Sequence, residues 1–126
     1  MKRDMELIRK ILLNIEENYI DVALYNIEIE GYDLKTIAYH CQLCHDAKLI
    51  SDYRGNYGDD EILSFGVGSL TWEGHEFLEK IRDDTIWYKT KKIMKDKGIK
   101  FTINAIEQIA TKLIDIAIQA AIKSIT

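Results

Sequence analysis

The segment 36–50 constrains the fold most strongly, because within it a helical pattern runs directly into a β pattern. Ile37, Cys41 and Cys44 are separated by four and then three positions, which places them on one face of an α-helix. Leu49 begins a short aliphatic run of the kind that forms a strand. The sequence therefore predicts a helix that buries both cysteines and is followed at once by a strand.

Two elements are expected ahead of this segment. Apolar residues at helical spacing predict a helix over 1–18, with Asp4 as its N-cap. Looser alternation predicts a strand at about 24–30, and Asp33 is placed to cap the next helix, over 33–48. The space between that strand and that helix allows only a very short additional helix, or none if the strand replaces it.

A β-hairpin is predicted after the 33–48 helix. Residues 51–61 combine two glycines, an asparagine and three adjacent acids, which is typical of a turn, and residues 62–70 return as a second strand. Helix, strand, helix and hairpin together favour an α+β winged helix-turn-helix. In such a fold the 33–48 helix enters a DNA groove and the hairpin is the wing.

The chain is expected to divide into a winged-helix domain over 1–84 and a carboxy-terminal helical extension over 85–126. Thr71 is predicted to cap the helix that follows the wing, and Gly74 inside its first turn indicates a close approach to the wing. Gly98 is expected to stop a basic helix that precedes it.

The last helix, over about 102–124, has an apolar arc that exceeds half its circumference. A domain of this size can hardly cover it alone, so a second copy of the helix is the expected partner, giving a homodimer. Packing within the monomer and contact with a membrane surface are the alternatives. The residues expected in the dimer contact are Ile106, Ile109, Ala110, Leu113, Ile116, Ala117 and Ala120.

The formal net charge of −4 argues against bulk attraction to nucleic acid, but the charge is unevenly distributed. Residues 1–79 hold seven basic and sixteen acidic side chains, whereas residues 80–100 hold eight basic and three acidic ones. Two cysteines and the lack of a secretion signal point to the reducing cytoplasm. No apolar run is long enough to cross a membrane.

Histidines and cysteines cluster at His40, Cys41, Cys44 and His45, with the Cys-X-X-Cys-His spacing of c-type haem attachment. Haem is not expected, because attachment occurs outside the cytoplasm and the cysteines face the core. The pairs His40/Cys44 and Cys41/His45 lie about 100° apart around the helix axis, so one zinc ion cannot take all four. Core cysteines with partly exposed histidines are the prediction, with no metal; a site of two or three ligands is the alternative.

Catalysis and a cofactor are not expected. His75 lies between Glu73 and Glu76, but these side chains point in different directions on a helix and no nucleophile or phosphate loop accompanies them.

If the predicted winged helix acts as it does in transcriptional regulators, duplex DNA is the expected ligand. The side chains predicted to lie off the buried stripe of the 33–48 helix are Lys35, Thr36, Tyr39, His40 and Gln42. Arg54, Asn56 and Tyr57 are predicted at the wing tip, and Lys89 and Lys92, with Lys91 and Lys95, are predicted to add backbone contacts. The acidic run Asp59, Asp60 and Glu61 opposes such binding.

Residues 37–50 resemble the recognition-helix segment of arsenical-repressor-type winged-helix regulators. In that family a histidine-leucine pair is followed by a spaced leucine, a small-residue turn and two aliphatics. Cys41 and Cys44 stand here in place of the leucines, and Lys48 in place of the usual glycine.

A closer resemblance covers most of the chain. Met1-Lys2-Arg3-Asp4-Met5, Tyr39-His40, Leu49-Ile50, the segment Leu70-Thr71-Trp72-Glu73-Gly74-His75-Glu76-Phe77-Leu78, and Arg82-Asp83-Asp84-Thr85 with Trp87 resemble the domain-of-unknown-function 2513 family. This resemblance implies a winged-helix-like fold in bacteria and their phages, with no established activity. The expected function is a non-enzymatic DNA-binding regulator; the alternative is a protein-binding module, such as a phage-encoded inhibitor or accessory factor acting on a host protein.

Overall fold

The computed structural model describes all residues, 1–126, as five helices and a three-stranded antiparallel sheet, which confirms the α+β class. The chain forms two compact units, Met1–Leu78 and Glu79–Thr126. The elements in chain order are α1 (Met5–Asn18), β1 (Leu24–Tyr25), α2 (Leu34–Asp46), β2 (Tyr53–Gly58), β3 (Glu61–Val67), α3 (Trp72–Ile81), α4 (Asp84–Lys97) and α5 (Ile103–Ser124).

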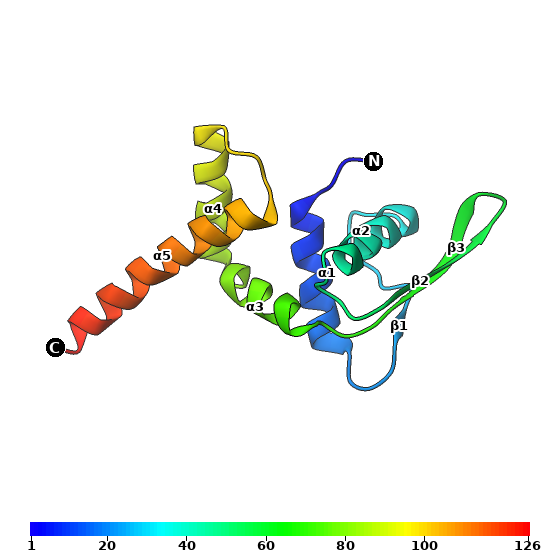
Figure 1. Cartoon of the computed structure of the whole chain (residues 1–126), viewed down its shortest axis with the longest axis horizontal. Helices are drawn as coiled ribbons and strands as arrows, with labels where there is room; N and C mark the ends of the chain where they lie inside the picture. The colour runs from blue at the N-terminus through cyan, green and yellow to red at the C-terminus, as the bar shows by residue number, and fades with distance from the viewer. The chain divides into compact units, whose positions relative to one another are not determined.

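In the first unit α1 and α2 pack against each other, and α2 also packs on the sheet (Figure 1). The strand order is β1-β3-β2, so β3 pairs with both other strands. Asp4 and Asp33 cap α1 and α2 as predicted, because each carboxylate accepts a hydrogen bond from the backbone N–H three residues later. The apolar faces of both helices meet in the core.

The predicted strand over 24–30 is wrong beyond its first two residues. Asn26 has a φ of 48°, and this left-handed conformation turns the chain out of the sheet. Its Oδ1 accepts from the Phe65 N–H at 2.8 Å and its own N–H donates to the Phe65 carbonyl at 2.9 Å. The residues that follow, up to Asp33, form a loop with neither strand nor helix.

The hairpin differs from the prediction in its turn. The expected turn over 51–61 contains strand β2, and the true turn is the pair Asp59–Asp60, with φ values of 51° and 66°. Two consecutive left-handed residues match the twist of a tight hairpin. The strand predicted to start at Leu49 is reduced to a single bridge, between Ile50 and Leu70.

The end of α2 is fixed to the start of α3. Lys48 has a φ of 63°, and the Leu49 N–H donates back to the Cys44 carbonyl at 2.9 Å, so the helix ends in a Schellman motif built on lysine. The Thr71 hydroxyl donates to the Lys48 carbonyl and accepts from the Gly74 N–H. A Cβ at Gly74 would overlap the Leu49 carbonyl oxygen, so the predicted close approach is present, but its partner precedes strand β2 of the hairpin.

In the second unit α4 and α5 pack against each other. Asp83 and Thr102 cap the two helices, and Gly98, with a φ of 65°, ends α4 as predicted. The Lys80 Nζ and a Glu107 carboxylate oxygen are 2.6 Å apart, so an ion pair ties the start of this unit to α5.

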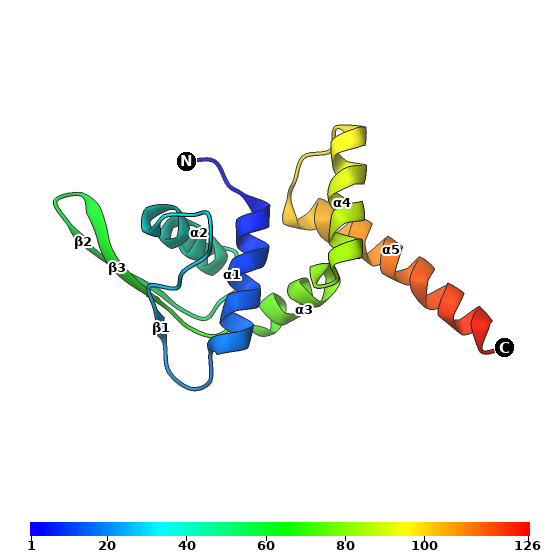
Figure 2. The same cartoon turned by 180° about the vertical axis from the view of Figure 1, so that it is seen from behind.

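The apolar arc of α5 is covered only near its start. Ile106 and Ala110 are fully buried inside the chain, so their predicted place in a dimer contact is wrong. The second half of the helix extends past α4 (Figure 2), and Ile116 there is 57% exposed. None of the five helices combines the length and apolarity needed to cross a bilayer.

Cys41 and Cys44 are wholly buried, as predicted, and both are free thiols. Burial raises the pKa of the Cys44 thiol to about 12. Burial also raises the pKa of Cys41, and the neighbouring Cys44 adds to the effect. A buried apolar site disfavours the thiolate, so both groups act as small hydrophobic side chains at neutral pH.

These raised pKa values predict that stability falls in alkali. An unfolded thiol ionises near pH 8.5, whereas the folded thiols stay protonated, so above that pH the unfolded chain holds fewer protons and the free energy of unfolding decreases. Urea unfolding between pH 8 and 10.5 should show this decline, and the double variant Cys41→Ala/Cys44→Ala should decline less steeply. Equal slopes for the two proteins, or rapid thiol modification of the folded protein at pH 8, would contradict burial.

Candidate nucleic-acid interface

The outward side of α2 faces the hairpin across a small cavity. Lys35, Tyr39 and Gln42 are exposed on α2, and they line a cavity of about 150 Å³ together with Tyr57, Asp60 and Ile62 from the hairpin. Four of these six residues lie at positions predicted from sequence to be available for contact, and Asp60 belongs to the acidic run expected to oppose DNA. The structure thus brings predicted side chains from two separate elements onto one face.

The amino-terminal segment also reaches this face. Met1 lines the same cavity, and the exposed Lys2 and Arg3 follow it directly in the chain. Sequence reasoning gave these two cations no role, because nothing local indicates that residues ahead of the first helix return to α2. They raise the number of positive charges near the α2 surface.

The hairpin residues lie along β2, so their predicted position at the tip is wrong. Arg54 and Asn56 are exposed strand residues, and the tip itself is Asp59–Asp60. The Arg54 Nε is 3.0 Å from an Asp52 carboxylate oxygen, and both side chains are solvated. Such an exposed ion pair contributes little to stability, so Arg54 can readily exchange Asp52 for another anion.

His40 is not a surface residue, so its predicted role in binding DNA is wrong. It is completely buried, its Nδ1 lies 2.8 Å from the Thr36 carbonyl, and the Asp4 backbone N–H donates to its Nε2 at 2.8 Å. One nitrogen therefore donates and the other accepts, as in a neutral imidazole with its proton on Nδ1. Thr36 is half-buried and contributes its carbonyl to this contact.

Asp4 links His40 to Tyr32 in the 26–33 loop. The Tyr32 hydroxyl donates to the Asp4 carboxylate at 3.0 Å. Burial and that hydrogen bond raise the pKa of Tyr32. The Lys10 Nζ lies 5.8 Å from the centre of the Tyr32 ring, a cation–π distance. The network joins α1, the 26–33 loop and α2.

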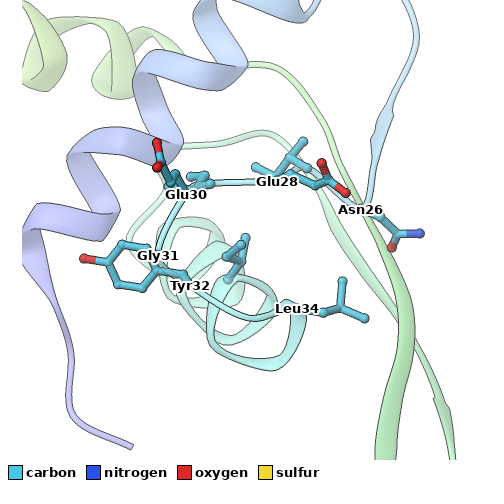
Figure 3. Close-up of a pocket in the computed structure, with 9 residues that line it drawn as sticks. Asn26, Glu28, Glu30, Gly31, Tyr32 and Leu34 are labelled. Atoms are coloured by element: carbon cyan, nitrogen blue, oxygen red, sulfur yellow. The ribbon is translucent and has the colours of Figure 1, made fainter.

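A larger cavity, of about 640 Å³, is lined by the 26–34 loop and Ile37 of α2 (Figure 3). The carboxylates of Glu28 and Glu30 extend from this loop in different directions. The chain has no group of three or more His, Cys, Asp or Glu side chains placed to share a metal ion. The loop's negative charge makes it unsuitable for phosphate.

The predicted lysines of the second unit, Lys89 and Lys92, are both exposed on α4. Lys92 Nζ pairs with an Asp96 oxygen at 3.2 Å. His45, one turn beyond Cys41, is exposed, and α2 continues unbroken through all four histidine and cysteine positions.

Comparison with known proteins identifies relatives without a described activity. Residues 2–100 match a family described as "Hypothetical protein (DUF2513)". An uncharacterized protein of Haemophilus influenzae is 37% identical over 115 residues, which cover 90% of this chain and 96% of that protein. No solved structure matches the chain. The match over most of its length shows that the chain belongs to the DUF2513 family.

Proposed function

We propose that the first unit is a winged helix that binds duplex DNA, with α2 in the major groove and the β2–β3 hairpin as the wing. The observation that carries this proposal is the shared face of α2 and the hairpin, on which Lys35, Tyr39, Gln42 and Tyr57 line one cavity. A helix of 13 residues is about 20 Å long, which suits the major groove.

The side chains on this face have complementary tasks in such a complex. Gln42 presents an amide that pairs bidentately with adenine, and the Tyr39 hydroxyl bonds to a phosphate or a base edge. Lys35 binds a phosphate on this face, and Lys2 and Arg3 add two more cations from the amino-terminal segment. Arg54 lies on the opposite side of β2 from Tyr57 and binds a phosphate farther along the duplex.

Electrostatics limit the affinity. Residues 1–78 carry seven basic and fifteen acidic side chains, so bulk attraction is absent and only local contacts hold the phosphates. Four phosphate contacts predict a slope of about −3 to −4 when the logarithm of the binding constant is plotted against the logarithm of salt concentration.

Selection from a random duplex library, followed by anisotropy titrations at 50 to 200 mM salt, tests the proposal. Lys35→Glu should weaken binding to every duplex. Gln42→Ala should lower the affinity for the selected sequence by about fivefold or more and leave the affinity for unselected DNA unchanged. Lys123→Glu, which reverses an equal charge at the end of α5, is the matched control and should change little. Absence of binding to any duplex at 50 mM salt would refute the proposal.

A protein-binding role is the second candidate, and the acidic excess of the first unit is the observation that favours it. A basic protein partner would be attracted by this charge, whereas DNA would be repelled. Affinity capture from a bacterial lysate separates the two roles if it is done with and without nuclease. A partner retained after nuclease treatment, and lost from a Tyr39→Ala variant, would favour protein binding through the same face.

We further propose that the protein is a homodimer through the second half of α5. Ile116, Ala117 and Ala120 are exposed on one face of the second half of α5, and nothing in the second unit covers this apolar surface. Residues 101–126 carry two basic and two acidic side chains, so one copy of the helix does not repel another. Ile109, Leu113, Ile116, Ala117 and Ala120 keep their predicted part in this contact, whereas Ile106 and Ala110 do not.

Light scattering of the purified chain at 10 to 100 µM measures this association. The wild-type mass should be twice that of one chain, and Ile116→Glu should give a monomer because it places a charge in the apolar contact. Thr111→Glu introduces the same charge on the opposite, polar side of α5 and should remain dimeric. A monomeric wild type at 100 µM would rule out the contact.

A further inference from the structure

The second unit has a groove of about 550 Å³. None of the residues that line it belongs to the α2 face. The groove is formed by one side of α4 and by the connection to α5. Its lining residues are Tyr88, Lys91, Lys92, Lys95, Asp96 and Phe101. Three lysines and two aromatic rings thus line one groove.

The charge of this groove follows from the two sides of α4. Trp87, Thr90 and Met94 are buried on one side, which leaves the lysines on the other. The groove holds one acidic residue, Asp96, which already pairs with Lys92 in an exposed and therefore weak contact. Within a segment of eight basic and three acidic residues, the groove carries a local excess of positive charge.

The two aromatic rings of the groove differ in their contacts. Phe101 stacks on Trp87 with ring centres 5.7 Å apart and an interplanar angle of 25°. Lys91 Nζ lies 5.4 Å from the centre of the same indole, so this side of the groove is held in place. Tyr88 is 64% exposed, and its ring has no stacking partner among the aromatic contacts of the structure.

We propose that this groove binds single-stranded nucleic acid, with a base stacked on Tyr88 and the flanking phosphates bound by Lys92 and Lys95. Stacking on an exposed aromatic ring suits an unpaired base, because a duplex keeps its base faces covered. Lysines along one helix face suit the regularly spaced phosphates of a strand. The groove shares no residue with the proposed duplex contact, and this proposal stands whether or not that contact exists.

Anisotropy titration of the full-length protein with a labelled 15-nucleotide oligothymidine at 50 mM salt tests the groove. Tyr88→Ala should weaken binding by about fivefold or more, because it removes one base stack. Lys95→Glu should weaken binding and lower the magnitude of the salt slope by about one. Circular dichroism of each variant should match the wild type, because both substituted residues are exposed.

Two controls make the result specific to the groove. Lys123→Glu reverses a charge on α5 and should leave oligothymidine binding unchanged, whereas Tyr88→Phe keeps the ring and should restore it. Lys35→Glu should affect duplex binding alone, so failure of the duplex proposal is distinguishable from failure of this one. Lack of binding at 50 mM salt, equal loss in Lys123→Glu, or an unchanged Tyr88→Ala would each overturn the proposal. Binding of an acidic peptide that Tyr88→Ala weakens, in a wild-type protein that does not bind oligothymidine, would identify a protein ligand in its place.

Discussion

The hydrogen bond from the Asp4 backbone N–H to His40 Nε2 is the contact on which the arrangement of the first unit depends. It joins Asp4, the N-cap residue of α1, to the middle of α2. The Nδ1 atom of the same imidazole hydrogen-bonds to the Thr36 carbonyl within α2. An unpaired backbone N–H in the core costs about 1–3 kcal/mol. Histidine supplies the acceptor that a leucine or phenylalanine at this position would lack, and it therefore sets how α2 is rotated against α1.

That rotation determines which residues α2 presents to solvent. With His40, Cys41 and Cys44 turned inward, Lys35, Tyr39 and Gln42 lie opposite and face the hairpin. The proposed DNA contact is thus a consequence of core packing. Lys48, which closes α2 in a left-handed conformation, then aims the chain so that Thr71 and α3 dock beside it.

Much of the fold was predictable because its signals are local. Asp4, Asp33 and Gly98 mark helix ends through short-range hydrogen bonds and backbone conformation, and the cysteines fall on an apolar helical face. The hairpin turn was not predictable, because Asp59–Asp60 lacks the glycine that usually marks such a turn, while Gly55 and Gly58 lie inside β2. The burial of His40 was also not predictable, since its partner Asp4 is 36 residues away and offers a backbone group.

The protonation of His40 tests this account most directly. Long-range proton–nitrogen NMR spectra of the imidazole at pH 7 distinguish the two neutral tautomers and the imidazolium. We expect the proton on Nδ1 and an unprotonated Nε2, together with slow exchange of the Asp4 amide proton with solvent. A ring protonated on Nε2, or a rapidly exchanging Asp4 amide, would contradict the claim that this histidine holds α2 against α1.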